Sequence, residues 1–156
     1  MVEQVTLKRL LHHAIQKEIE SQQLYIDMGK RMTDQAARDA FDELYHQELG
    51  HQKALERYAR GGFKRGALPP KKAVNYKIAE HFGEPEISPN MQLKDVFLLA
   101  ANREKAAYEL YHSLSDMHPP GEVKELFAEL AADELRHKQK VEFFYTEVAF
   151  PQTDGG

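Results

Sequence analysis

Residues 37–58 read ARDAFDELYHQELGHQKALERY, and side chains at alternating spacings of four and three form one stripe along this segment. The stripe comprises Ala37, Phe41, Leu44, Glu48, His51, Leu55 and Tyr58. Such spacing is typical of an amphipathic helix whose apolar face packs against a core. Glu48 and His51 interrupt that face with ionisable groups, which a stable apolar core does not need. The segment therefore predicts a long helix that carries a polar pair on its buried face.

Three other segments show the same periodicity, and each carries ionisable residues on its apolar stripe. The first stripe contains Glu18, the third contains Glu104, and the fourth contains Glu134 and His137. We expect helices at about 4–32, 34–60, 91–117 and 120–149, with a crossover over 61–90.

The two halves of the chain match at an offset of 86 residues, which indicates a duplicated helical hairpin. The offset pairs Glu18 with Glu104, Glu48 with Glu134, His51 with His137, Tyr25 with Tyr111, and Phe41 with Phe127. The same offset therefore relates the ionisable residues and the core positions around them.

Short loops join the two helices of each half, so the paired helices are expected to lie antiparallel. Thr33 and Asp34 can cap the second helix, and Pro119-Pro120-Gly121 turns the chain into the fourth. The crossover, rich in Gly and Pro, is long enough to travel the length of a bundle, and residues 73–82 within it are expected to form a short helix. The prediction is a single all-α domain, a four-helix bundle of two duplicated antiparallel helical hairpins joined by a long crossover.

The composition is that of one ordinary soluble domain, with 156 residues, 42% hydrophobic residues, 29% charged residues and a net charge of −4. Nothing in it indicates a nucleic-acid or membrane partner, and the first residues lack the apolar run of a signal peptide, so we expect a cytoplasmic protein. The chain has no cysteine, which excludes disulfides, thiolate metal sites and iron–sulfur clusters. Redox electrons would therefore have to come from another protein or a small molecule.

The six ionisable stripe residues predict a site for two metal ions. Positions i and i+3 share a helix face, so Glu48 with His51, and Glu134 with His137, can each present an oxygen and a nitrogen to one point. Glu18 and Glu104 would bring four carboxylates and two imidazoles into one core layer. Without metal this layer would be costly, because crowded buried carboxylates repel one another and lose hydration. Two divalent cations would neutralise the four negative charges.

The ligand types favour iron or manganese. Four oxygens and two nitrogens without sulfur suit these ions better than structural zinc, which prefers four-coordinate Cys/His sites, or calcium, which prefers oxygen alone. Six ligands shared by two ions leave coordination positions open, and on a redox metal this favours chemistry with dioxygen or hydrogen peroxide. A buried polar network without metal is the alternative interpretation.

Other residues resemble the site residues but lie off the stripes. Glu43 and His46 repeat the Glu-x-x-His spacing, and Glu20 is close to Glu18, yet all three are interpreted as exposed helix residues. Tyr25 and Tyr111 lie two helical turns beyond Glu18 and Glu104, where they serve either as core aromatics or as partners that bond ligand carboxylates or move electrons. The basic residues between 64 and 72 are interpreted as a solvated face, with a docking patch for an acidic electron donor as the alternative.

The stretch Ala14-Ile-Gln-Lys-Glu18-Ile-Glu-Ser-Gln-Gln-Leu-Tyr25, with the two Glu-x-x-His helices, resembles the rubrerythrin branch of the ferritin-like superfamily. The resemblance covers residues 5–60 and 91–149 and implies a ferritin-like bundle with a di-iron centre. It implies that Glu48 and Glu134 bridge the ions, that Glu18 and His51 complete one ion, and that Glu104 and His137 complete the other.

Two departures distinguish the chain from rubrerythrins. It lacks the cysteines of a rubredoxin domain, and Ala101 stands where those proteins commonly place an additional ligand Glu. Its six-residue set is similar to that of bacterioferritin-like ferroxidase sites. The leading hypothesis is a di-iron oxidoreductase whose reduced centre is oxidised by hydrogen peroxide or dioxygen, in oxidative-stress defence or iron handling.

The alternatives to this hypothesis are a ferritin-like or bacterioferritin-like iron storage or ferroxidase protein, a metal-free scaffold that binds a partner, and an oxidase of an organic substrate. We also expect an external electron donor protein and a homodimer or higher homo-oligomer.

Overall fold

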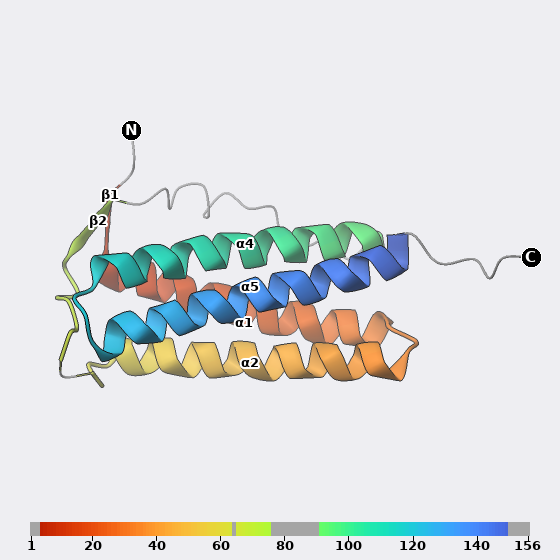
Figure 1. Ribbon diagram of the computed structural model, residues 1–156, viewed down its shortest axis with the longest axis horizontal. Coiled ribbons are helices and arrows are strands. Elements are labelled where there is room, and N and C mark those ends of the chain that lie inside the picture. The colour runs from red at the N-terminus through yellow and green to blue at the C-terminus, as the bar shows by residue number, and fades with distance from the viewer. Residues whose placement is uncertain (1–3, 64, 76–90, 150–156) are drawn as a thin grey trace, which may run out of the picture.

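The computed structural model describes residues 4–63, 65–75 and 91–149, and the four expected helices lie within these ranges (Figure 1). Their bounds are α1 (Leu7–Arg31), α2 (Gln35–Ala59), α4 (Leu93–Met117) and α5 (Glu122–Ala149). Each observed end lies within three residues of the expected one. The predicted all-α four-helix bundle is confirmed.

Of the two residues expected to cap α2, Asp34 does so. Asp34 is the N-cap, and its side chain accepts a hydrogen bond from the Ala37 N–H at 3.1 Å. After the helix, Gly61 adopts a φ of +78° and donates its N–H to the Tyr58 carbonyl at 3.0 Å. A left-handed residue of this kind ends a helix by satisfying its last carbonyl groups, and glycine adopts it without steric cost.

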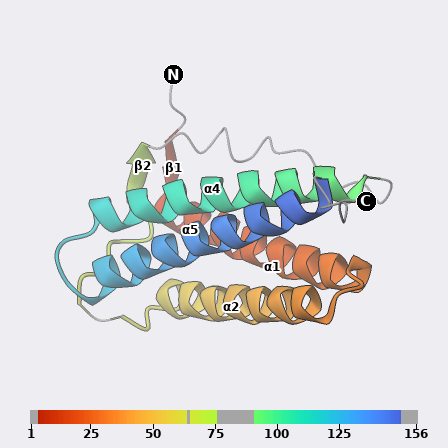
Figure 2. The same ribbon diagram turned by 45° about the vertical axis from the view of Figure 1, so that its right-hand side comes forward.

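The four helices form two hairpins (Figures 1 and 2). α1 packs closely against α2 and α4 against α5, while α1 also contacts α4 and α2 contacts α5. α2 ends at the strand-bearing end of the bundle, whereas α4 begins at the opposite end (Figure 1). The intervening chain therefore has to cover the length of the bundle, as the predicted crossover requires, although residues 76–90 lie outside the described residues.

Two short strands correct the predicted helix boundaries. β1 (Gln4–Thr6) pairs antiparallel with β2 (Ala73–Asn75). The expectation that the first helix begins at residue 4 is therefore wrong, and so is the expected helix at residues 73–75. The rest of that second helix, 76–82, lies outside the described residues.

Burial and hydrogen bonding at the start of α1 hold the preceding residues in an extended strand. Val5 is buried in the core, which holds β1 extended against the end of the bundle. Thr6 is the N-cap and accepts a hydrogen bond from the Arg9 N–H at 3.2 Å. The Leu7 N–H, which has no partner within its own helix, donates to the Lys72 carbonyl at 2.8 Å. The first turn of α1 is thus completed by a segment far away in sequence.

The buried core consists of two apolar clusters, one toward each end of the bundle. One cluster includes Leu11, Leu55, Tyr111 and Phe127, and lies toward the strands. The other includes Tyr25, Phe41, Phe97 and Val141. The polar stripe residues lie near the middle of each helix, so they form a layer between the two clusters.

A buried hydrogen-bonded chain ties the segment after α2 to the strand-bearing end. The Leu68 N–H donates to the Tyr58 hydroxyl at 3.0 Å, and that hydroxyl donates to His118 Nε2 at 2.7 Å. His118 Nδ1 in turn donates to the Leu114 carbonyl at 2.6 Å. Burial lowers the pKa of His118, so the ring stays neutral and its Nε2 accepts the hydrogen bond of the Tyr58 hydroxyl.

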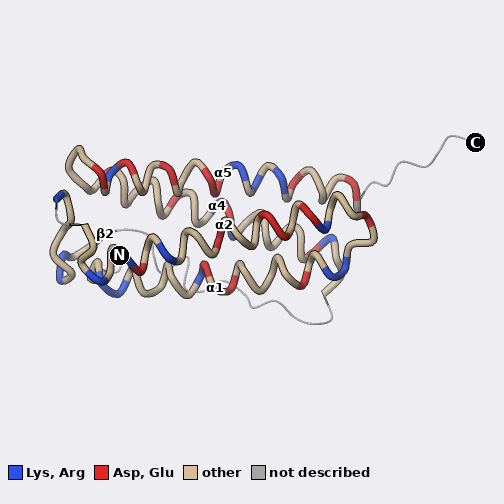
Figure 3. The backbone as a smooth tube through the Cα atoms, turned by 90° about the horizontal axis from the view of Figure 1, so that it is seen from below, with Lys and Arg blue, Asp and Glu red and all other residues tan. Residues whose placement is uncertain are grey.

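Charged positions occur along all four helices, and Lys and Arg gather at the strand-bearing end (Figure 3). Arg65, Lys71 and Lys72 are exposed there, whereas Lys64 lies outside the described residues. The interpretation of this run as a solvated face agrees with their exposure, and the docking alternative stays a prediction. None of the helices in the described ranges is long and apolar enough to cross a membrane.

Candidate metal centre

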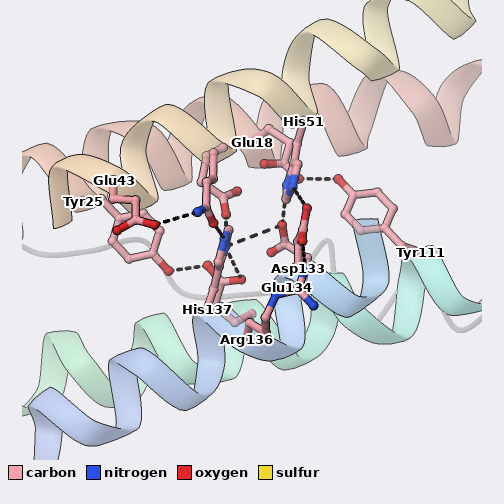
Figure 4. Close-up of polar contacts among 12 residues, drawn as sticks. Glu18, Tyr25, Glu43, His51, Tyr111, Asp133, Glu134, Arg136 and His137 are labelled. Carbon is pink, nitrogen blue, oxygen red and sulfur yellow. Dashed lines mark hydrogen bonds and ion pairs between the residues drawn. The ribbon is translucent and has the colours of Figure 1, made fainter. Parts of the chain in front are cut away.

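The six ionisable stripe residues meet in one buried layer, to which all four helices contribute (Figure 4). Their exposed fractions range from 1% to 5% in the set Glu18, Glu48, His51, Glu104, Glu134 and His137. This follows from the stripes, because each residue occupies a core-facing position near the middle of its helix. The predicted layer is confirmed as a geometric arrangement.

The layer contains two groups of four residues, each of which could hold a metal ion. One group is Glu18, Glu48, His51 and Glu134, and the other is Glu48, Glu104, Glu134 and His137. Within each group the potential ligand atoms lie within 4.8 Å of one another. Glu48 and Glu134 belong to both groups. Their shared position matches the bridging role implied by the resemblance, and that role stays a prediction.

Each of the six residues also carries a buried polar atom that, within the described part of the chain, has no hydrogen-bond partner. These atoms are Glu18 Oε2, Glu48 Oε1, His51 Nδ1, Glu104 Oε2, Glu134 Oε1 and His137 Nδ1. His51 Nδ1 lies 2.6 Å from Glu134 Oε1, and His137 Nδ1 lies 2.5 Å from Glu48 Oε1, but neither contact has hydrogen-bond geometry. Carboxylate oxygens and imidazole nitrogens that converge without hydrogen-bond partners can be satisfied by a pair of bound cations, so these residues fit a metal centre.

Burial and mutual repulsion change the protonation of the carboxyl groups. Burial, and then the charge of Glu18, raise the pKa of Glu48 well above its usual range. Burial and the charge of Glu104 do the same to the pKa of Glu134. Burial also acts to raise the pKa of Glu104, but its contacts with Glu134 and His137 outweigh it and lower that pKa. The metal-free layer therefore retains protons that bound cations would displace.

The outer nitrogen of each histidine is held by a residue from the opposite hairpin. His51 Nε2 donates to Asp133 Oδ2 at 3.0 Å, and His137 Nε2 donates to Gln47 Oε1. Burial lowers the pKa of His51, but the hydrogen bond to Asp133 and the Glu18 carboxylate, 3.6 Å from Nδ1, outweigh it and raise that pKa to about 9. Both rings are thereby oriented with Nδ1 facing the carboxylates. This arrangement of an outer acceptor behind an inner ligand nitrogen is usual for metal-bound histidines.

Asp133 and Gln47 were not among the predicted site residues. They immediately precede Glu134 and Glu48, and the offset of 86 relates one to the other. Their places next to Glu134 and Glu48 were the available signal, but both lie off the apolar stripes, so the periodicity did not select them.

The two tyrosines bond carboxylates of the layer from opposite sides (Figure 4). The Tyr111 hydroxyl donates to Glu18 Oε1, and the Tyr25 hydroxyl donates to Glu104 Oε1. Burial, and then the neighbouring carboxylates, raise the pKa of both tyrosines well above 10, so both remain protonated donors. Both tyrosines are buried core aromatics, and their hydroxyls bond the carboxylates, so these two interpretations hold together. A catalytic role stays a prediction.

The off-stripe residues lie outside the layer, as expected. Glu20 and His46 are exposed, and Glu20 forms ion pairs with Arg103 at 3.0 Å and Lys17 at 3.4 Å. Glu43 is also exposed, but it accepts a hydrogen bond from Gln47 Nε2 at 3.2 Å and so contacts the residue that holds His137.

A cavity of about 30 Å³ adjoins the layer between α1 and α4. Ala14, Ser21, Ala106 and Ala107 contribute small side chains to its wall, and Glu18, Glu48 and Glu134 line its inner side. A cavity of this size holds a molecule comparable to water. It gives small molecules a place next to the carboxylates.

No protein-family model and no curated protein matches the chain. Its fold is similar to that of a hypothetical protein from Pyrococcus furiosus whose structure has been solved, with a TM-score of 0.74. The two share 22% sequence identity over 95% of this chain and 93% of the other. At that identity the similarity shows the fold alone, and the four-helix arrangement is common to both proteins.

Proposed function

We propose that this chain is a rubrerythrin-like, non-haem di-iron oxidoreductase whose reduced centre is oxidised by hydrogen peroxide or dioxygen. The observation that carries the proposal is the pair of buried four-residue groups that share Glu48 and Glu134. The proposed roles are oxidative-stress defence or iron handling, in the cytoplasm, in a homodimer or higher homo-oligomer.

The donor set supports iron, with manganese as the other candidate. Four carboxylates and two imidazoles without sulfur suit these ions, and two divalent cations would balance the four negative charges. In this proposal Glu48 and Glu134 hold both ions. Glu18 with His51 completes one position, and Glu104 with His137 completes the other. The bound ions would supply the redox chemistry, one electron from each.

Residues next to the proposed ligands hold the ligand side chains in place by hydrogen bonds. Tyr25 and Tyr111 each bond one oxygen of Glu104 and Glu18, which leaves the other oxygen of each carboxylate to bind an ion. Asp133 and Gln47 fix the two histidine rings with Nδ1 inward. The apolar clusters on both sides exclude bulk water, which strengthens electrostatic interactions within the layer.

The surroundings of the layer suit a small oxidant and an external electron donor. The adjoining cavity holds a molecule of about the size of water, which suits a small oxidant better than an organic substrate. The exposed basic residues at the strand-bearing end, including Arg65 and Lys71, offer a surface for an acidic donor protein.

Anaerobic titration with ferrous iron tests the proposal, and about two ions per chain are expected from two ligand groups. The loaded protein is then mixed in parallel with peroxide and with dioxygen in a stopped-flow spectrometer. Rapid oxidation by either supports the function and identifies the preferred oxidant. Binding of fewer than two ions contradicts it. Light scattering on the same sample tests the storage alternative, because a small oligomer is incompatible with a storage shell.

A further inference from the structure

The duplication is broken at the residues that hold the two histidines. All six proposed ligands and both tyrosines are identical between the halves at the offset of 86. The residue behind His51 is Asp133, whereas the equivalent residue behind His137 is Gln47. The two halves of the centre thus differ by one carboxylate in place of one amide.

Asp133 and Gln47 orient the histidines that they bond in the same way. A carboxylate can only accept a hydrogen bond, so Asp133 requires the proton of His51 to be on Nε2, 3.0 Å from its Oδ2. Glu43 likewise can only accept, and it lies 3.2 Å from Gln47 Nε2, so Gln47 Oε1 faces His137. In the neutral form of each ring the lone pair is therefore on Nδ1, and the halves do not differ in tautomer.

The two halves differ in the strength of the hydrogen bond that the histidine makes to its acceptor. A hydrogen bond to a charged acceptor is roughly twice as strong as one to a neutral acceptor, and a carboxylate behind a histidine makes its other nitrogen a better metal donor. Arg136 pairs with Asp133 through Oδ1, which leaves Oδ2 to His51. The Arg136 side chain is 65% exposed, so solvent weakens its effect on the carboxylate.

We propose that Asp133 is a positioning residue that makes the two metal positions unequal. The position formed with Glu18 and His51 binds its divalent ion first, and the position formed with Glu104 and His137 binds second and more weakly. This inference rests on the proposed two-metal function. Such outer partners typically change metal affinity 10- to 100-fold, and for a partly exposed carboxylate we expect a difference of about tenfold.

The test is an anaerobic titration with Co²⁺, followed by calorimetry and by the visible spectrum of the bound ion. The unmodified protein should show two binding steps that differ by about tenfold in affinity. Asp133→Asn keeps a hydrogen-bond acceptor but removes its charge, so it should weaken the first step and bring the two steps together. Circular dichroism confirms that each variant is folded.

The equivalent change in the other half is the matched control. Gln47→Glu supplies a carboxylate behind His137, and combining it with Glu43→Gln avoids repulsion between adjacent acids. This double variant should strengthen the second step, whereas Glu43→Gln alone should not. His51→Gln should abolish the stronger step and His137→Gln the weaker one, which assigns each step to its position.

The outcomes separate this inference from the proposed function. Two bound ions of equal affinity, or two steps that Asp133→Asn leaves unchanged, overturn the inference and leave the two-metal function standing. Failure to bind two ions overturns both.

Discussion

The hydroxyl of Tyr25 in α1 donates a hydrogen bond to Glu104 in α4, and the hydroxyl of Tyr111 in α4 donates an equivalent hydrogen bond to Glu18 in α1. Each hairpin thus holds a buried carboxylate of the other hairpin. The two bonds lie on opposite sides of the polar layer, and they join the halves where apolar packing is interrupted (Figure 4).

Replacing either tyrosine by phenylalanine should destabilise the metal-free protein. Tyr25→Phe leaves Glu104 without this donor, and Tyr111→Phe does the same to Glu18. Loss of a partner for a buried polar group costs about 1–3 kcal/mol, so each variant should lower the free energy of unfolding by a similar amount. Urea unfolding followed by circular dichroism measures it, with Tyr45→Phe, at a half-buried position of α2 outside the polar layer, as the control. Unchanged stability in both variants would show that these bonds contribute nothing.

Replacing both shared glutamates by leucine should stabilise the metal-free protein and abolish metal binding. Burial and the neighbouring carboxylates raise the pKa of Glu48 and of Glu134, which shows that their charged forms are disfavoured. Exchange of buried ionic groups for apolar ones can stabilise a protein by about 1–4 kcal/mol. Thermal unfolding with a chelator and with Mn²⁺ measures both effects for Glu48→Leu with Glu134→Leu. The exposed Glu129→Leu is the control, and a less stable double variant would contradict the argument.

The helices and the polar layer could be predicted because both follow from local periodicity. A residue such as Glu104 lies on an apolar stripe, and the stripe of a helix faces the core whatever the detailed packing. The offset of 86 then indicated that the two hairpins present equivalent residues. Periodicity and this offset together identify the six proposed ligands without any contact distance.

The features that could not be predicted depend on contacts between distant segments. Residues 4–6 form a strand because residues 73–75 pair with them, and such pairing overrides local helix propensity. Asp133 lies off its own stripe, and it reaches His51 only because α5 and α2 pack side by side. Periodicity describes one helix at a time, so it assigns such a residue to the surface.

Filling the cavity between α1 and α4 should slow oxidation of the iron-loaded protein. Ala107→Leu places a larger side chain in the wall of a cavity of about 30 Å³ that adjoins Glu18 and Glu48. We expect a decrease of about tenfold in the oxidation rate, or about 1.4 kcal/mol in the barrier, with unchanged iron stoichiometry because no ligand changes. Stopped-flow mixing with peroxide and dioxygen measures it. Ala128→Leu on the exposed face of α5 is the control, and equal rates would mean that the oxidant arrives by another route.

The free energy of unfolding of the metal-free protein should fall as the pH rises from 7 to about 9. The pKa of His51 is raised from 6.5 to about 9, so the folded protein binds this proton more tightly than the unfolded chain does. The stability that the protonated ring contributes is therefore complete below pH 6.5 and is lost as the pH rises through about 9. The raised pKa values of Glu48 and Glu134 act in the same direction, because the folded state retains protons that the unfolded state has released. Each such proton contributes up to about 1.4 kcal/mol per pH unit.

Urea unfolding at pH 7, 8 and 9 with a chelator measures the decline, which Asp133→Asn should reduce. Bound Mn²⁺ should remove it by displacing the protons, and constant or rising stability without metal would contradict the assigned protonation.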